Sequence, residues 1–487
     1  MSALQKLFKQ TFIYGLATVL PRMLSFLLTP FYTSNGVLSS PAEYGELSII
    51  FSYFIILNVI LSYGMETAFF RFFNKEGNKQ KVISTSTISI LISSIGFFFI
   101  AILLKHEIAS LIRVKEMYVN LVIWVILLDA LAIIPFAWLR ATQKPIKYSV
   151  IKILNVIVNI GLNFFLLLWL KNLAVGNNFF NSIYKPNYEI NYIIIALIIA
   201  SSITLLLMLP FYVKVKYNFD KKLWKSMMRY ALPVLIAGIA YTINETFDKI
   251  LLDYLLPKNI SKTQIGMYSA CYKIAVFMTL FVTAYRLGIE PFFFSHAKSK
   301  NPQKNYALIL EFFVALGSII LLSVVVFADI FKVFIVRSEA YWEAMWVVPI
   351  ILLANFCLGI YHNLSVWYKI TDKTKFGAYI SIIGAIITLV LNFWLIPIMS
   401  YKGSAIATLA AYASMMFISF YLGRKYYPIP YNFKKIGLYL IISILFSTIS
   451  FYLFRGNYLI GSSFLLVFLG FVFFIEKKEL KKLFIKK

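Results

Sequence analysis

Long apolar runs recur along the whole chain, and they constrain its fold more than any other feature. About 20 apolar residues are enough to cross a bilayer as a helix. The runs are continuous rather than alternating, which favours helices over a β-barrel. We therefore expect an all-α polytopic membrane protein with about 14 transmembrane helices. They cover approximately residues 11–33, 45–67, 84–104, 118–139, 148–170, 191–213, 230–256, 265–287, 306–328, 344–368, 376–397, 403–422, 436–454 and 457–475.

The charge distribution agrees with these runs. Charged residues make up 14% of the chain, against about a quarter in soluble domains. The 47 lysines and arginines outnumber the 20 acids, which in a soluble protein would suggest nucleic-acid binding. If the N-terminus lies inside the cell, most basic residues fall in inner segments, as the positive-inside rule requires. The excess therefore indicates topology rather than nucleic acid, and it places both termini in the cytoplasm.

Two short motifs recur in the same order. Thr142–Lys144 and Leu162–Phe164 parallel Thr371–Lys373 and Leu391–Phe393 at an offset of 229 residues. Shared order and spacing suggest an internal duplication.

A second pair of similar segments extends the duplication. Gly45–Ser48 parallels Gly266–Ser269 at an offset of 221 residues. We expect a six-helix bundle over residues 1–225, its repeat over 226–425, and two extra helices with a basic tail over 426–487. Transporters built from such repeats bind substrate near the membrane midplane, where the repeats meet.

Arg22 lies near the middle of the first apolar run, directly after Pro21. Charges inside a membrane usually face a bundle interior or a watery cavity. No acid occurs within 11–33, and a guanidinium is well suited to holding phosphate. The alternatives are pairing with an acid on another helix, or snorkelling to the surface.

The run over 230–256 carries charges on one helical face. Glu245 and Lys249 are one turn apart, with Asp248 beside them. Lys249 is a candidate ligand for a substrate, but Glu245 could neutralise it within the helix. Lys273, in the next run, is expected at a similar depth. It could bind substrate or serve Asp248 or Glu245.

Three polar residues of the first bundle are further candidates. Asn155 and Asn159 lie one turn apart, and such amides either hold helices together or hydrogen-bond a hydroxyl-rich ligand. Asp129 stands alone in its run, as a proton or cation site or as a partner of Arg22.

Motifs of enzyme chemistry are missing from the sequence. It has no Walker-type phosphate loop, no nucleophile elbow and no His/Cys metal spacing. Its two cysteines lie in apolar runs, where buried, inert thiols are expected. We expect a transporter rather than an enzyme, with no metal and no cofactor.

Several stretches resemble the Wzx-type polysaccharide (O-antigen) flippases of the multidrug/oligosaccharidyl-lipid/polysaccharide exporter superfamily. The resemblance spans nearly the whole chain. The similar stretches are Tyr14–Thr33, Ala42–Ser48, Thr246–Leu252, Ile265–Lys273 and Tyr285–Ala297.

This resemblance implies two bundles in a V-shaped arrangement around a cationic cavity. The substrate would be an undecaprenyl-pyrophosphate-linked oligosaccharide, moved from the inner to the outer leaflet of a bacterial cytoplasmic membrane. It would serve the synthesis of O-antigen lipopolysaccharide, capsule or exopolysaccharide, alongside a glycan polymerase or other assembly proteins. The matching cavity cations are Arg22, Lys249 and Lys273.

The resemblance leaves two further questions open. Arg71, Arg140 and Arg286 lie at inner helix ends, where they would receive the headgroup or merely enforce topology. Proton or sodium coupling is proposed for some members, and Asp129, Glu245 and Asp248 would be the coupling candidates here.

Three other functions compete with this interpretation. A lipid II flippase would have the same fold and a similar cavity. A cation-coupled multidrug exporter typically needs an acid early in the N-terminal bundle, where this chain has Arg22. A membrane-bound glycan polymerase or ligase would need a substantial outer loop, and none is present in the expected topology.

Overall fold

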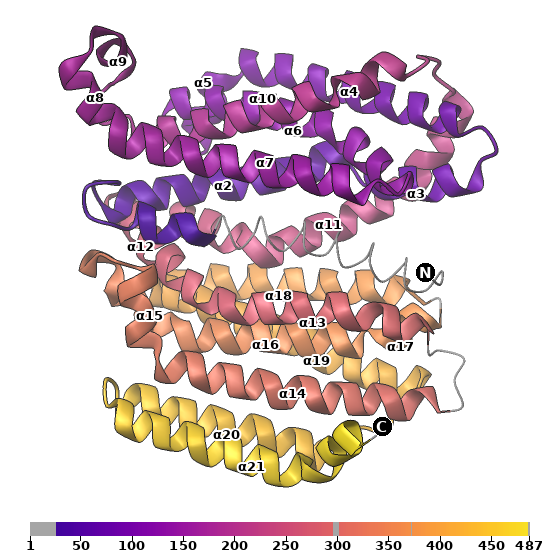
Figure 1. The fold of residues 1–487 in the computed structure, drawn as a ribbon, viewed down its shortest axis with the longest axis vertical. Helices are drawn as coiled ribbons and strands as arrows, with labels where there is room; N and C mark the ends of the chain where they lie inside the picture. The colour runs from indigo at the N-terminus through magenta and orange to yellow at the C-terminus, as the bar shows by residue number, and fades with distance from the viewer. Residues whose placement is uncertain (1–25, 296–300, 372, 486–487) are drawn as a thin grey trace. The chain divides into compact units, whose positions relative to one another are not determined.

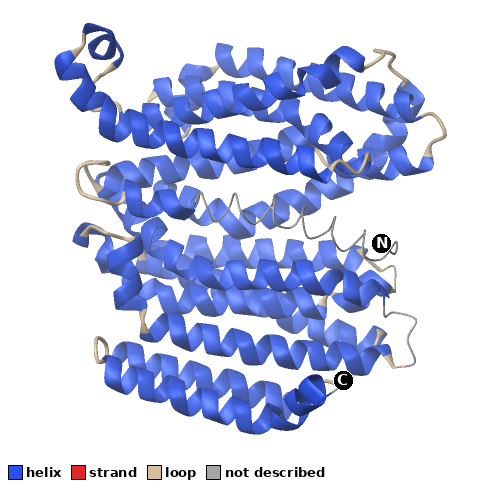
Figure 2. Cartoon of the chain, viewed as in Figure 1, coloured by secondary structure: helices blue, strands red, loops and turns tan. Residues whose placement is uncertain are grey.

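A computed structural model describes residues 26–295, 301–371 and 373–485, and this part of the chain contains helices and loops but no strand (Figure 2). Within it, 13 helices are long and apolar enough to cross a membrane. Each overlaps one of the predicted runs from 45–67 onward. The first predicted run, 11–33, lies mostly outside the described residues. The all-helical, multi-pass fold is therefore confirmed.

Contacts divide the chain into two compact units, Met1–Gly266 and Met267–Lys487. In the first unit residues 26–32 are helical. Its further helices are α2 (Pro41–Ser62), α3 (Met65–Lys75), α4 (Lys79–Leu103), α5 (Lys105–Leu111), α6 (Glu116–Ala141), α7 (Pro145–Phe164), a π-helical turn (Phe165–Trp169), α8 (Leu170–Gly176), α9 (Asn178–Ile183), α10 (Glu189–Lys214) and α11 (Lys221–Leu255).

Neighbouring helices of the first unit pack side by side (Figure 1). Helix α10 packs against α6 and α7, α4 packs against α6, and α11 packs against α2 and α3. The helix that we expected to begin the second bundle thus packs with the first. Packing units and sequence repeats are different properties, so the proposed boundary at residue 225 stays a prediction.

Helix α12 (Lys258–Tyr272) crosses from the first unit to the second. The second unit continues with a 3₁₀ turn (Lys273–Ala275), α13 (Val276–Ser295), α14 (Pro302–Val326), α15 (Ala328–Ile335), a 3₁₀ segment (Glu339–Val347), α16 (Val348–Leu364), α17 (Val366–Ile370), α18 (Lys375–Met399), α19 (Tyr401–Tyr426), α20 (Phe433–Tyr452) and α21 (Tyr458–Ile485). Helix α19 packs against α16 and α18, and α14 packs against α20 and α21.

Buried charges join the C-terminal hairpin, α20 and α21, to α14. The Nζ atom of Lys435 lies 2.8 Å from Oε2 of Glu311 and 2.7 Å from Oε1 of Glu476. Tyr439 donates a further hydrogen bond of 2.7 Å to the same Oε1 atom. These contacts fix the two extra helices to the second unit.

Polar side chains set the start of two helices in the first unit. Asn78 accepts a hydrogen bond of 3.2 Å from the backbone N–H of Lys81 at the start of α4, and Asp220 accepts one of 2.8 Å from Leu223 at the start of α11. Such caps satisfy N–H groups that have no partner inside the helix.

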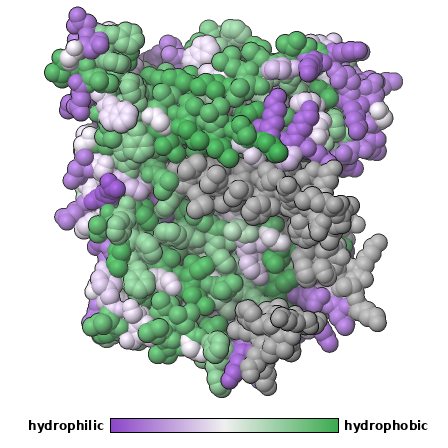
Figure 3. Space-filling view, viewed as in Figure 1, coloured by the Kyte–Doolittle hydropathy of each residue, from purple (hydrophilic) through white to green (hydrophobic). Residues whose placement is uncertain are grey.

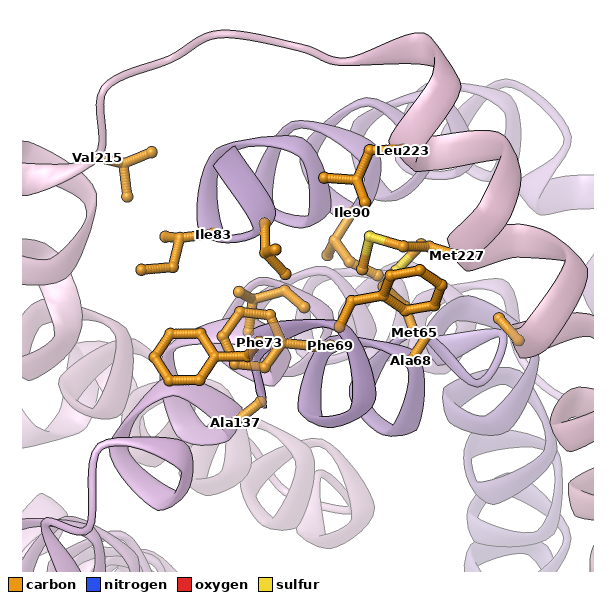
Figure 4. Packing of buried hydrophobic residues seen from close by; sticks show 14 of the residues in the cluster. Met65, Ala68, Phe69, Phe73, Ile83, Ile90, Ala137, Val215, Leu223 and Met227 are labelled. Carbon is orange, nitrogen blue, oxygen red and sulfur yellow. The ribbon is translucent and has the colours of Figure 1, made fainter. Parts of the chain in front are cut away.

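One core cluster of the first unit lies between α3, α4, α6, α10 and α11 (Figure 4). Phe69 and Phe73 of α3 stack on each other with ring centroids 5.3 Å apart. Leu223 and Met227, four residues apart on α11, are buried in the same cluster as Ile90 of α4. One face of α11 is therefore anchored in this core.

On the face that Figure 3 shows, hydrophobic residues cover the middle of each unit where it is not hidden by grey atoms, and hydrophilic residues gather towards the helix ends. Side chains such as Ile92 and Phe99 of α4 are 68% and 61% exposed. In water such a surface would be unfavourable, whereas lipid accepts it.

Candidate functional site

The charged face of α11 is held together by a contact between sequence neighbours. The Nζ atom of Lys249 lies 3.1 Å from Oδ1 of Asp248, and both side chains are largely buried. The backbone N–H of Lys249 donates to the same oxygen at 2.9 Å. Glu245 is half-buried one turn earlier. This geometry favours a structural role for Lys249, since binding an anion would compete with Asp248.

Asp253 connects the end of α11 to its surroundings. Its carboxylate accepts a hydrogen bond of 2.9 Å from Ser261 of α12. Its backbone carbonyl accepts one of 2.6 Å from Arg113, in the loop between α5 and α6. Asp253 therefore joins the end of α11 to α12 and to the loop between α5 and α6.

Asp129 belongs to a polar group buried between α6, α7 and α10. Ser201 donates a hydrogen bond of 2.7 Å to Oδ1 of Asp129. The positive charge of Lys152 on α7 also acts on Asp129. The Nζ atom of Lys152 lies 4.2 Å from the ring centroid of Phe136.

Our sequence interpretation missed Lys152, because it read this lysine as one more basic residue at an inner helix end. The available signal was spacing. Lys152 precedes Asn155 by three residues and Asn159 by seven, which places all three on one face of α7.

The asparagines of α7 hold helices together. Asn155 donates a hydrogen bond of 3.0 Å to Thr204 of α10. Asn159 accepts one of 2.7 Å from Asn163, which in turn accepts one of 2.8 Å from Tyr32. These contacts favour the structural alternative over a role in binding a glycan.

Lys273 lies in the 3₁₀ turn that separates α12 from α13, and it is partly buried. A short 3₁₀ stretch inside a long helix often marks a hinge. Lys273 belongs to the second unit and Lys249 to the first, so their common depth stays a prediction. Arg22 lies outside the described residues.

The three arginines at predicted inner helix ends have different surroundings. Arg140 donates a hydrogen bond of 2.6 Å to Glu66, and Arg71 lies over the ring of Tyr230 at 4.2 Å. Arg286 instead lines a small pocket in the second unit.

This pocket gathers two cationic side chains and a histidine from three helices. Arg286 of α13, His362 of α16 and Lys369 of α17 line it, and the charges of Arg286 and Lys369 both act on His362. The side chain of Asn363 also borders it, with its Nδ2 atom donating to the carbonyl of Gly359 at 3.0 Å. None of the described side chains that line the pocket is acidic. The pocket has a volume of about 10 Å³, the space of a single water molecule, so in this conformation its two cations attract an anion but do not enclose it.

The small residue Gly359 also lines this pocket. A Cβ atom added there would lie 2.5 Å from Cζ of Phe313 and 2.6 Å from Cγ2 of Val282. A larger residue would force these neighbours apart, so glycine allows α13, α14 and α16 to pack closely beneath the cationic groups.

The helices and their charged interior define a multi-pass membrane protein, and sequence comparison gives its family. A model of the family described as "Polysaccharide biosynthesis protein" matches residues 7–295, which is more than half of the chain. The chain therefore belongs to that family. No curated protein sequence matches it.

Solved structures share the fold. The structure titled "Lipid II flippase MurJ, inward closed conformation" is 15% identical, with a TM-score of 0.72, and the match covers 95% of this chain and 99% of that one. An inward-facing multidrug resistance MATE family transporter of the MOP superfamily is 12% identical, with a TM-score of 0.62, covering 88% and 96%. A MOP superfamily transporter from Pyrococcus furiosus is 12% identical, with a TM-score of 0.54, covering 86% and 95%. At these identities the likeness concerns the fold.

Proposed function

We propose that the chain is a flippase for undecaprenyl-pyrophosphate-linked oligosaccharides, moving them from the inner to the outer leaflet by alternating access. The product would serve synthesis of a surface polysaccharide such as O-antigen, capsule or exopolysaccharide. The observation that carries the proposal is the pocket in which the cations Arg286 and Lys369 lie beside His362, in a chain of the polysaccharide biosynthesis family.

The chemistry of such a substrate explains why cations are needed. A pyrophosphate cannot cross hydrocarbon unaided, because an isolated charge is costly there. Fixed cations can meet its charge with charge-assisted hydrogen bonds, while the prenyl chain stays in lipid. Alternation then requires that the two states bind the substrate differently.

The test compares two arginines with different surroundings. In a strain lacking the chromosomal copy, Arg286→Ala should lower surface polysaccharide about tenfold or more, as expected for loss of a hydrogen bond to a charged group. Arg140→Ala, which removes the partner of Glu66, is the control for topology. Lipid-linked oligosaccharide should accumulate in the inner leaflet with the first variant. Normal transport by Arg286→Ala at equal protein levels would contradict the proposal.

Lipid II translocation is the second candidate, because the fold match to the lipid II flippase covers 95% of this chain. Both substrates carry a pyrophosphate, so the pocket does not separate them. The two functions differ in the intermediate that accumulates after depletion: a polysaccharide precursor for the first, and lipid II for the second.

We also propose that transport is coupled to a proton or sodium gradient through Asp129. Its location beside Lys152 and Ser201, in the interior of the first unit, supports this. In vesicles, Asp129→Asn should abolish the dependence of transport on the coupling gradient. Ser201→Ala, which leaves the carboxylate in place, should keep that dependence. If Asp129→Asn still responds to both gradients, the coupling site lies elsewhere.

The predicted orientation completes the proposal, with both termini on the cytoplasmic side of the bacterial inner membrane. Labelling of single cysteines with a membrane-impermeant reagent tests it. A cysteine that replaces Lys222 should react only after the cytoplasmic membrane is permeabilised. One that replaces Asn187 should react in spheroplasts whose cytoplasmic membrane is intact.

A further inference from the structure

A pocket opens between α4 and α11 in the first unit, with a volume of about 320 Å³. This lies within the size range of sites for small ligands. Ile92 and Ser93 of α4 border it on one side, and Trp224 and Met228 of α11 on the other. Tyr63 and Phe219 also contribute to its wall.

The polar atoms of this pocket are already engaged with one another. The hydroxyl of Ser89 accepts a hydrogen bond of 2.9 Å from the indole N–H of Trp224, and it lies 2.7 Å from the hydroxyl of Tyr63. Ser93 donates to the carbonyl of Ile90 at 3.1 Å. Since these groups satisfy each other, the wall favours an apolar occupant.

The pocket is held open by the core behind it. Leu223 and Met227 precede Trp224 and Met228 by one residue each, and both are buried (Figure 4). The backbone between α2 and α3 is fixed as well. Tyr63 and Gly64 have left-handed backbone conformations, with φ of 32° and 71°. A Cβ atom added to Gly64 would lie 2.5 Å from the carbonyl oxygen of Ala231. A rigid wall lowers the entropic cost of binding.

Apolar surface continues from the pocket along both helices. On α11, Leu232 and Ile236 follow Met228 at intervals of four residues, with 47% and 56% exposure. On α4, Phe99 is 61% exposed, and Gly96 has no neighbour within 4 Å of an added Cβ atom. An extended hydrocarbon chain therefore has a continuous path out of the pocket.

Positive charge lies at the end where α11 begins. Lys221 and Lys225 are exposed and precede Trp224 and Met228 by three residues each, which places each lysine about one turn before a residue of the pocket wall. The adjacent acid, Asp220, forms an ion pair with Lys81. The rim therefore carries unneutralised positive charge, which complements an anionic headgroup. Basic pockets between membrane helices bind such headgroups.

We propose that this pocket binds one acyl chain of an anionic phospholipid, whose phosphate is held by Lys221 and Lys225. The site is separate from the cationic pocket of the second unit, and the proposal does not depend on the proposed transport function. A bound chain would fill the space between α4 and α11 and brace the start of α11.

Quenching of Trp224 by lipids with brominated acyl chains tests the proposal. The purified full-length protein is placed in phosphatidylcholine nanodiscs, and brominated phosphatidylglycerol is added in increasing mole fraction. The chain has eight tryptophans, so full quenching of Trp224 removes about one eighth of the emission. We expect a component of this size that saturates at low mole fraction and is absent from Trp224→Phe. Quenching of other tryptophans by surrounding lipid should rise without saturating.

Further variants separate the chain site from the headgroup site. Ser93→Phe fills the pocket and should abolish the saturable component, whereas Ile100→Phe, on the exposed part of α4, should keep it. Lys225→Gln should weaken binding of phosphatidylglycerol about fivefold, with Lys258→Gln, an exposed lysine at the start of α12 beyond the far end of α11, as the matched control. The lysine variants leave the pocket wall unchanged, so they test the proposal even if Ser93→Phe fails to fold.

Three outcomes would overturn the proposal. The first is a saturable component that is equally strong with brominated phosphatidylcholine. The second is a component that remains in Trp224→Phe. The third is displacement by undecaprenyl phosphate but not by unlabelled phosphatidylglycerol, which would make the pocket a site for the prenyl chain.

Discussion

Gly45 of α2 and Gly266 of α12 meet face to face within the first unit. A Cβ atom added to Gly45 would lie 2.9 Å from the backbone N of Gly266, and one added to Gly266 would lie 3.0 Å from the N of Gly45. The added atoms would also come within 1.8 Å of the carbonyl oxygens of Lys262 and Pro41. These are the two glycines that the predicted sequence repeat pairs. Glycine therefore occupies the contact point on both helices where α2 and α12 cross.

The first prediction concerns this crossing. Gly45→Ala and Gly266→Ala should each destabilise the protein by about 1–3 kcal/mol, as overpacking does, because the obstacle is backbone that cannot rotate away. Thermal unfolding in detergent measures the loss. Gly96→Ala, where an added Cβ atom meets open space, is the control and should be neutral. Equal melting temperatures for all three variants would show that the two helices separate at little cost.

The second prediction concerns the pair on α11. Lys249→Ala leaves the carboxylate of Asp248 buried without this cation, so it should destabilise the protein by about 3 kcal/mol. Lys249→Ala/Asp248→Ala should recover most of the loss, because no unpaired charge is left. Lys249→Ala/Glu245→Ala is the comparison. Better rescue by this second double variant would identify Glu245 as the main partner.

The third prediction concerns Arg22 in the first apolar run. Arg22→Ala should abolish surface polysaccharide while the protein is inserted at its normal level, since the sequence offers no acid on the same run to pair with it. The variant Arg22→Lys keeps the positive charge but removes the planar guanidinium group. Partial activity of the lysine variant is expected if a guanidinium fork holds the phosphate. Full activity of Arg22→Ala would rule out this role.

The fourth prediction concerns pH. Asp329 of α15 receives bonds of 3.0 Å from Nε and Nη2 of Arg455, and Nζ of Lys332 lies 2.6 Å away. Burial raises the pKa of Asp329, but the hydrogen bonds and charges of Arg455 and Lys332 outweigh it, so this pKa lies below its usual value. A carboxyl with a lowered folded pKa stabilises the protein above its unfolded pKa, about 3.9, and loses this contribution as pH falls through the folded value.

Asp329→Asn should therefore lower the melting temperature at pH 7 and at pH 5, and the difference should shrink below about pH 4. Differential scanning fluorimetry of both proteins across this range measures it. Asp220→Asn, at the start of α11, tests a second carboxyl whose pKa is lowered by its ion pair with Lys81. A difference for Asp329→Asn that grows towards low pH would contradict the assignment.

The helices were predictable because each lies in a run of apolar residues, and lipid leaves few alternatives to a helix. The predicted repeat depends on a similar signal. Asn163 and Asn392, which the repeat pairs, are both fully buried, and each donates to the carbonyl four residues earlier, at 2.8 and 2.7 Å. A buried amide is a rare and local signal, and it is easily recognised in a sequence.

The partners of the charged residues were harder to predict. A helical wheel pairs Lys249 with Glu245, whereas the contact found joins it to Asp248, because an adjacent carboxylate can also accept the backbone N–H. The pocket of Arg286 depends on His362 and Lys369, which lie far away in the sequence. Only the packing of α13, α16 and α17 brings these residues together.

The ionic contact between Glu311 and the C-terminal hairpin has a consequence for the history of this chain. The two extra helices lie beyond the predicted repeat, and a shorter ancestor without them is easily imagined. Yet Lys435 supplies a cation to Glu311, and a chain that ended after α19 would leave that carboxylate without this cation. Removal of the hairpin would therefore take away the cation that Glu311 pairs with, so we expect its gain or loss to be accompanied by a compensating change in α14.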